Sequence, residues 1–224
     1  FSFQNSKHLT CGEGGAVVGG DEAVMNRAFS YHDFGRPYNE PKPSAPGIVR
    51  LGTKCRMTEF QAAILLAQMK RLEEQSNRRW ENAKYLTDKI RDIPGIAVHK
   101  LYDGVTQAAY HLYPFRYHKE KFGGVPRTKF LAALNSEGIP CSGGYSPLNR
   151  QPFFENTLNS QNFQRMYSRE QLDRCRQQNQ CPDNDTLCTQ AVGLPQNVLL
   201  GTKEDMDDIA NAILKIYENR AELA

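Results

Sequence analysis

The sequence has 224 residues, of which 39% are hydrophobic and 24% are charged, and its formal net charge is +3. This composition is typical of a globular protein, and no apolar run approaches the roughly 18 residues of a membrane-spanning helix. The positive charge is small and dispersed, so composition argues against both a membrane protein and a nucleic-acid-binding protein.

Six cysteines are spread along the chain, without a CxxC pair and without a histidine at zinc-ligand spacing. We therefore expect reduced thiols, no metal site and a cytoplasmic protein. The sequence opens on Phe1 without a start methionine or a targeting pattern. This opening leads us to expect a segment of a longer protein.

The first predicted elements precede a proline-rich segment. Residues 1–20 are expected to form a loop and a Gly-rich turn, followed by a short strand at 16–18. Asp21 is a good helix N-cap and predicts a helix that ends near Asp33. Four prolines between Gly35 and Gly52 then predict an extended loop.

A long helical stretch begins at Thr58 and changes character halfway. Residues 57–72 are apolar nearly all round, which predicts burial on several sides. From Glu73 onward, apolar residues recur at helical spacing between charged ones, until Pro94-Gly95 ends the helix. We expect residues 73–93 to be a connector helix between two domains.

Beyond residue 94, predicted strands and helices alternate around a long polar segment. The strands are expected at 96–101, 111–117, 139–142 and 198–200. The helices are expected at 127–135, from a cap at Asp185 to Val192, and after a cap at Thr202. The polar segment, residues 149–180, is expected to be an excursion with some helix. This alternation predicts a small α/β domain over residues 94–224.

Lys7 has the most suggestive chemical surroundings in the sequence. An amine that condenses with a carbonyl must be unprotonated and held in one orientation. Ser2 offers a hydroxyl for a phosphate, and Gly12, Gly14 and Gly15 allow the backbone to approach closely. These residues alone also fit an ordinary solvated lysine on a loop.

The string Ser2–Gly15 closely resembles the cofactor-lysine signature of the DegT/StrS family of sugar aminotransferases. Further motifs that resemble the family follow in the expected order at 51–57, 61–63, 111–114, 138–140, 145–148 and 194–195. Members have the α/β, aspartate-aminotransferase-like fold of type I and are about twice as long as this chain. The resemblance therefore implies the C-terminal half of that fold. We expect a remnant of the large cofactor-binding domain at 1–72, the connector helix at 73–93 and the small domain at 94–224.

The resemblance also implies a cofactor, a reaction and roles for five residues. Lys7 would hold pyridoxal 5′-phosphate as a Schiff base and move a proton during amino transfer. Ser2 and Lys54 would bind the cofactor phosphate, and His111 and Tyr145 would lie near the substrate. The substrates would be an amino donor, glutamate or glutamine, and a keto-sugar or keto-cyclitol. Members work as homodimers with active sites at the subunit interface.

Each of the four supporting residues also has a structural interpretation. Ser2 could be a turn hydroxyl, Lys54 a surface lysine, His111 a structural histidine at a strand start, and Tyr145 a packing aromatic.

The sequence departs from the family in three respects. Lys54 stands where members usually have an asparagine that reaches the neighbouring subunit's cofactor, and an ammonium binds phosphate only as a point charge. Gly144 replaces a histidine found before the tyrosine in many members, which favours a cyclitol ketone as substrate. The front half of the family fold, which carries the partner of the pyridine nitrogen, has no counterpart here. We therefore expect this chain alone to be inactive and its apolar segment at 57–72 to be uncovered.

Two alternatives remain open. One is a pyridoxal-phosphate-dependent sugar dehydratase, although relatives of that type replace the lysine with histidine, so Lys7 argues against it. The other is a truncated, non-catalytic domain with a dimerising or regulatory role.

Overall fold

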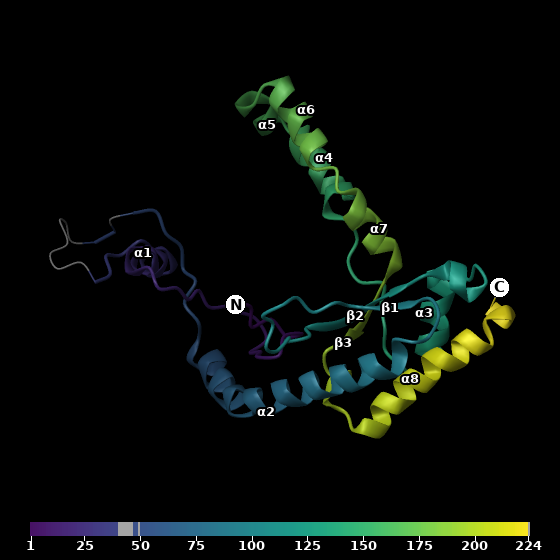
Figure 1. Cartoon of the computed structure of the whole chain (residues 1–224). Helices are drawn as coiled ribbons and strands as arrows, with labels where there is room; N and C mark the ends of the chain where they lie inside the picture. The colour runs from purple at the N-terminus through teal and green to yellow at the C-terminus, as the bar shows by residue number, and fades with distance from the viewer. Residues whose placement is uncertain (40–46, 49, 224) are drawn as a thin grey trace. The chain divides into compact units, whose positions relative to one another are not determined.

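The computed structural model describes residues 1–39, 47–48 and 50–223 (Figure 1). It divides into two compact units, Phe1–Asn77 and Arg78–Ala224, and helix α2 (Glu59–Ile90) contributes to both. Three of the four prolines of the proline-rich segment, Pro41, Pro43 and Pro46, lie outside the described residues. Among the helices that are described, none is both long and apolar enough to cross a membrane.

The first unit contains helix α1 (Glu22–His32), which begins where the sequence predicts. The Asp21 side chain accepts a hydrogen bond of 3.0 Å from the backbone N–H of Val24, so the predicted cap is confirmed. The predicted strand at 16–18 is wrong. Ala16 exchanges backbone hydrogen bonds only with Phe1, and the residues that follow have no strand partner.

Helix α2 begins with a reciprocal cap in the first unit. The Gln61 side chain accepts from the Thr58 backbone N–H at 3.0 Å, and the Thr58 hydroxyl accepts from the Gln61 N–H at 3.3 Å. Predicted burial on several sides is wrong, because Leu65 is buried while Phe60 is 85% exposed. The expectation of an uncovered apolar face is confirmed by the exposure of Phe60, Leu66 and Met69.

The second unit is built on a three-stranded antiparallel sheet in the order β1-β2-β3. Its strands are β1 (Ile96–Val98), β2 (Leu112–Tyr117) and β3 (Ala191–Pro195). Side chains alternate across a strand, and in β2 Tyr113, Phe115 and Tyr117 are the buried set. The unit therefore has the α/β character that the sequence predicts.

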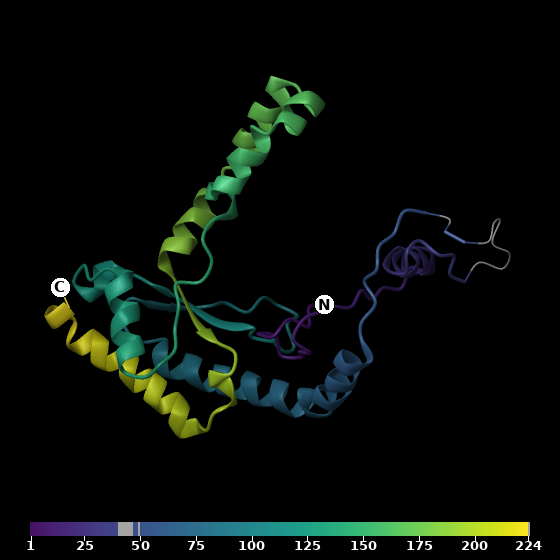
Figure 2. The same ribbon diagram turned by 180° about the vertical axis from the view of Figure 1, so that it is seen from behind.

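Helices α3 (Arg127–Ser136), α8 (Lys203–Glu218) and the second part of α2 cover this sheet. Figures 1 and 2 show α2 and α8 running along the same side of the strands. Their apolar side chains form one core with the strands, including Leu86, Ile90, Phe130, Leu134, Met206 and Ile213. Thr202 caps α8 through a capping box with Asp205, as predicted.

A helical insertion, residues 143–190, separates the end of α3 from β3 (Figure 1). It contains a short 3₁₀ turn η2 (Leu148–Arg150), α4 (Pro152–Leu158), α5 (Gln161–Met166), α6 (Arg169–Gln178) and α7 (Pro182–Gln190). The predicted polar excursion is therefore mostly helical.

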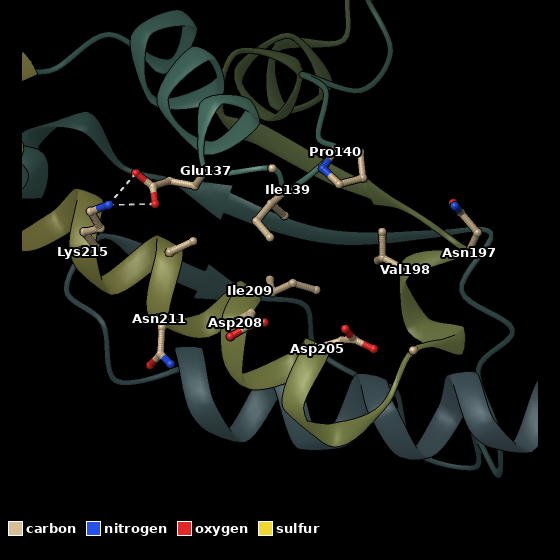
Figure 3. Close-up of a pocket in the computed structure, with 13 residues that line it drawn as sticks. Glu137, Ile139, Pro140, Asn197, Val198, Asp205, Asp208, Ile209, Asn211 and Lys215 are labelled. Atoms are coloured by element: carbon tan, nitrogen blue, oxygen red, sulfur yellow. Dashed lines mark hydrogen bonds and ion pairs between the residues drawn. The ribbon is translucent and has the colours of Figure 1, made fainter.

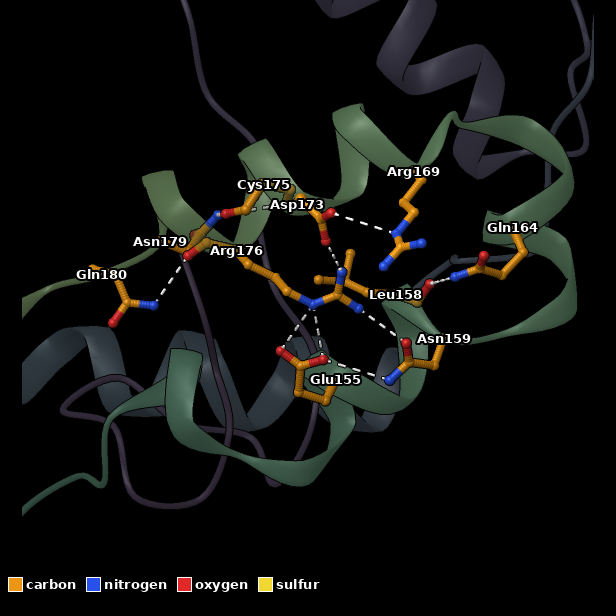
Figure 4. A network of polar contacts seen from close by, with 10 residues as sticks. All are labelled: Glu155, Leu158, Asn159, Gln164, Arg169, Asp173, Cys175, Arg176, Asn179 and Gln180. Carbon is orange, nitrogen blue, oxygen red and sulfur yellow. Dashed lines mark hydrogen bonds and ion pairs between the residues drawn. The ribbon is translucent and has the colours of Figure 1, made fainter.

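A polar network joins the helices of this insertion (Figure 4). Arg176 pairs with Glu155 at 3.1 Å and with Asp173 at 2.9 Å, and it donates to Asn159 at 2.9 Å. Leu158, which lies beside this network in Figure 4, is buried. The guanidinium thus links the outgoing helix α4 to the returning helix α6.

Four predictions for the second unit are corrected by the structure. The strand expected at 139–142 is reduced to an isolated bridge between Ser142 and Gly193. The strand expected at 96–101 ends at Val98. The helix expected from Asp185 begins at Pro182, because proline fits the first helical position and leaves Asp185 inside the first turn.

The fourth correction concerns residues 198–200, which form the 3₁₀ turn η3 (Val198–Leu200) in place of a strand. The side-chain amide of buried Asn82 donates to the carbonyls of Leu199 and Gly201, at 3.0 and 2.9 Å. These hydrogen bonds take the place of a strand ladder.

Candidate functional site

Lys7 lies half-buried in a tight turn of the first unit. Its backbone N–H donates to the Gln4 carbonyl at 2.9 Å, which closes the turn. Phe3 ties the two arms of the loop together, since its N–H donates to Gly14 at 2.9 Å and its carbonyl accepts from Cys11 at 3.0 Å. The loop therefore holds the lysine backbone on both sides.

Glycine is required where the two arms of this loop meet. A Cβ atom on Gly15 would lie 2.7 Å from the Phe1 carbonyl oxygen, which no side-chained residue tolerates. Gly14 has a φ of +136°. This close approach pairs Gly15 with Ser2. The exposed Ser2 hydroxyl accepts from the Gln4 N–H at 3.3 Å, so Ser2 and Lys7 belong to the same hydrogen-bonded loop.

Lys54 lies on a segment that pairs with the end of α1. Its isolated bridge partner is Asp33, and the adjacent Cys55 N–H donates to the His32 carbonyl at 2.9 Å. A Cβ on Gly52 would overlap the backbone nitrogen of Gly35, so this pairing also depends on glycine.

Lys54 is exposed beside a charged cluster. The carboxylate of Asp33 contacts Arg56 at 3.3 Å and Arg36 at 3.5 Å. The segment thus carries an excess of positive charge, which suits an anion.

His111 and Tyr145 belong to the second unit. His111 is half-buried directly before β2, and Tyr145 is 72% exposed after Gly144, whose φ is +73°. The residue before His111 is Tyr110, a buried tyrosine with a φ of +53°. Such a backbone conformation is unfavourable for a bulky residue and needs support from its surroundings.

An aromatic cluster supports Tyr110. His99 Nε2 and the Tyr110 hydroxyl lie 2.8 Å apart, and the Trp80 ring stacks on Tyr110 with centroids 6.0 Å apart. Burial lowers the pKa of His99, and the hydrogen bond to the Pro114 carbonyl opposes this effect. The sequence analysis missed this cluster, because its members come from three separate segments of the chain.

The structure places Ser2, Lys7 and Lys54 in the first unit and His111 and Tyr145 in the second. Their roles toward a cofactor and a substrate stay predictions. All six cysteines are free thiols. Within the described ranges, no three His, Cys, Asp or Glu residues form a group that could hold a metal ion.

None of these five residues lines either of two larger cavities in the described part of the chain. One of about 690 Å³ in the first unit is lined by Met25, Phe29, His32, Tyr38 and Cys55, among others. The other, of about 760 Å³, lies beside α8 in the second unit (Figure 3). Two of its acidic residues are engaged, since Glu137 pairs with Lys215 at 2.8 Å and Asp205 caps α8.

Comparisons with known proteins agree with the motifs of the sequence. The model of the DegT/DnrJ/EryC1/StrS aminotransferase family matches residues 1–214. An L-glutamine:2-deoxy-scyllo-inosose aminotransferase of Micromonospora echinospora is 31% identical, over 100% of this chain and 53% of that protein. An L-glutamine:scyllo-inosose aminotransferase of Streptomyces griseus is 32% identical, over 100% of this chain and 54% of that protein.

A solved structure, that of 3-amino-5-hydroxybenzoic acid synthase, superposes with a TM-score of 0.74 at 25% identity. The match covers 97% of this chain and 53% of the synthase. The chain thus spans about half the length of the curated relatives it matches. The expected C-terminal half of a type I α/β fold is confirmed.

Proposed function

Because the chain belongs to the DegT/DnrJ/EryC1/StrS aminotransferase family, we propose that it is the lysine-bearing part of a pyridoxal-phosphate-dependent aminotransferase. The reaction would transfer an amino group from glutamine or glutamate to a keto-cyclitol or a keto-sugar. The names of the relatives, which pair L-glutamine with inososes, support a cyclitol ketone. Gly144, in place of the histidine of many family members, supports the same choice.

The Lys7 loop is the observation that carries the proposal. The lysine is half-buried, its turn is closed by backbone hydrogen bonds, and a hydroxyl lies on the same loop at Ser2. A primary amine, a hydroxyl and a basic segment around Lys54 form a donor set that fits an aldehyde bearing a phosphate.

Each residue would have a distinct task. Pyridoxal phosphate, when bound, supplies the electron sink for the reaction. The Lys7 Nζ would hold the cofactor covalently and, once released as a free amine, would move the proton between the substrate carbon and the cofactor's C4′ carbon. The Ser2 hydroxyl would donate to the phosphate, and Lys54 would add a positive charge. His111 and Tyr145 would orient the substrate.

The proposal extends to assembly and organisation. We propose a cytoplasmic homodimer in which Lys54 serves the neighbouring subunit's cofactor. The domains would be residues 1–72, 73–93 and 94–224. Since the chain spans about half of its relatives, turnover would need the rest of the fold, and the 224-residue chain alone would be inactive.

A trapping experiment with the 224-residue chain tests the proposal. After incubation with pyridoxal phosphate and reduction with borohydride, peptide mass spectrometry should find a saturable adduct on Lys7. A Lys7→Arg variant should lose this adduct, whereas Lys100→Arg, at an exposed position outside the proposed site, should keep it. Labelling spread over surface lysines, with no preference for Lys7, would overturn the proposal and favour a non-catalytic domain.

The dehydratase alternative makes a different prediction. Relatives of that type carry histidine at the cofactor-lysine position, and this chain has Lys7. A stable adduct at Lys7 therefore supports amino transfer over deoxygenation.

A further inference from the structure

One nitrogen of Arg127 contacts both ends of the helical insertion. The Nη1 atom donates to the Gly143 carbonyl at 3.0 Å, where the chain leaves for the insertion. The same atom donates to the carbonyls of Cys188 at 2.8 Å and Ala191 at 2.6 Å, where the chain returns. Arg127 is the first residue of α3, so these bonds tie both ends of the insertion to that helix.

The outgoing end is shaped to receive the guanidinium. A Cβ on Gly143 would lie 3.1 to 3.3 Å from the guanidinium atoms of Arg127, so glycine allows the backbone to lie against them. Just before it, Ser142 exchanges two backbone hydrogen bonds with Gly193, at 3.0 and 2.9 Å. Gly144 then turns with a φ of +73° and leads into Tyr145. Tyr145 thus lies two residues beyond the Gly143 carbonyl that Arg127 contacts.

Two other arginines near the base of the insertion make different contacts. Arg116 donates to the Gln190 side chain at 2.9 and 2.7 Å and therefore touches only the returning end. Arg150 pairs with Asp185 at 2.8 Å, which joins the two limbs of the insertion to each other. Of these three arginines, Arg127 alone joins both limbs to α3.

We propose that Arg127 is a positioning residue that holds Tyr145 and the helical insertion in one orientation relative to the sheet, and thereby shapes the substrate side of the site. The substrate part of this inference rests on the proposed function, in which Tyr145 faces the keto substrate. The mechanical part does not. A guanidinium suits this role because its hydrogen-bond donors are rigid and permanently charged. A lysine at this position could donate to only some of the three carbonyls.

Hydrogen exchange of the 224-residue chain tests the mechanical part. In Arg127→Met, amides in residues 142–146 and 188–193 should both exchange at least tenfold faster than in the unchanged chain. Arg127→Lys should restore part of the protection. Residues 113–117, in the middle of the sheet, serve as the internal reference and should not change.

Matched variants separate this role from general loosening. Arg116→Met should accelerate exchange only at 188–193, and Arg150→Met only within the insertion. Chymotrypsin cleavage after Tyr145 should rise in Arg127→Met and not in Arg116→Met. Unchanged exchange at 142–146 in Arg127→Met would overturn the proposal. The proposal would also be overturned if exchange in the reference strand, residues 113–117, were accelerated as much as at 142–146 in both Arg127 variants. Arg127 would then support folding of the whole unit.

The same samples distinguish failure of this inference from failure of the proposed function. Lys7 trapping should be unaffected by Arg127→Met, since the two residues belong to different units. If no sample gives the Lys7 adduct but hydrogen exchange changes as expected, the proposed function is contradicted and the positioning role of Arg127 is supported. If Lys7 is trapped normally but hydrogen exchange is unchanged in Arg127→Met, only the positioning role of Arg127 is contradicted.

Discussion

The side-chain amide of Gln61 donates a hydrogen bond of 2.8 Å to the backbone carbonyl of Glu13. This bond joins the first turn of α2 to the Gly-rich turn behind Lys7. The oxygen of the same amide accepts from the backbone N–H and the hydroxyl of Thr58, both at 3.0 Å. One side chain therefore starts a helix with its oxygen and steadies the lysine loop with its nitrogen.

Gln61→Glu separates these two tasks. A carboxylate keeps the acceptor for Thr58 but has no N–H for the Glu13 carbonyl. We expect unchanged helicity by circular dichroism, faster acetylation of Lys7 and a lower yield of the Lys7 adduct at limiting pyridoxal phosphate. The lost hydrogen bond is worth about 0.5–1.5 kcal/mol. Gln68→Glu is the control, since it adds the same charge to the same helix, where Gln68 accepts from Arg71 at 2.6 Å. Equal Lys7 reactivity in the two variants would contradict this role for Gln61.

Phe60 should dominate self-association of the chain through α2. It is 85% exposed beside other apolar residues, and contiguous apolar surface drives association. Phe60→Ser should reduce light scattering at high concentration while changing the free energy of unfolding by no more than about 0.5 kcal/mol. Leu65→Ser should act in the opposite way, because Leu65 is buried and its loss lowers stability. Unaltered scattering in Phe60→Ser would place the association surface elsewhere.

Asn82 should contribute strongly to the stability of the second unit. It is buried, and its amide satisfies the carbonyls of Leu199 and Gly201. Asn82→Ala should lower the free energy of unfolding by about 1–3 kcal/mol, because two acceptors lose their donor. Asn82→Asp should cost at least as much, since a carboxylate cannot donate. Asn211→Ala, at an exposed position of α8, is the control for urea denaturation. Similar midpoints for the Asn82 and Asn211 variants would refute the assignment.

Stability should fall below about pH 6.5 because of His99. Burial lowers the pKa of His99 in the folded chain, so the folded state favours the neutral ring and the unfolded state binds the proton more readily. The neutral His99 ring therefore contributes fully to the stability of the folded chain above the pKa that His99 has in the unfolded chain. This contribution is lost as the pH falls toward the pKa of His99 in the folded chain. Urea midpoints at pH 7.5 and 5.5 should differ more in the unchanged chain than in His99→Asn. An equal pH dependence in both would exclude His99 as the source.

Features with strong local signals could be predicted from the sequence. Asp21 and Thr202 carry the side chains of N-caps, and the structure has both helices where these residues place them. The core strand Leu112–Tyr117 follows from alternating apolar residues. The motif around Lys7 is also local, because its lysine, hydroxyl and glycines lie within fourteen residues.

Features that depend on distant partners could not be predicted. Residues 198–200 are apolar and fit a strand by composition, but Asn82, more than a hundred residues earlier, binds the carbonyls of a 3₁₀ turn there. The contacts of Arg127 reach 16 to 64 positions along the chain. Apolar periodicity also cannot report whether neighbours exist to cover a face, which is why burial at 57–72 was wrongly expected.

The shared anchor at Arg127 has a consequence for how the helical insertion can vary in sequence and length. Because the two ends of the insertion are fixed side by side, the segment between them can be exchanged without rebuilding the sheet. Doubling the length of a flexible connection costs only about 0.6 kcal/mol in closure entropy. Residues 143–190 can therefore change in length and sequence while the sheet of the second unit keeps its structure.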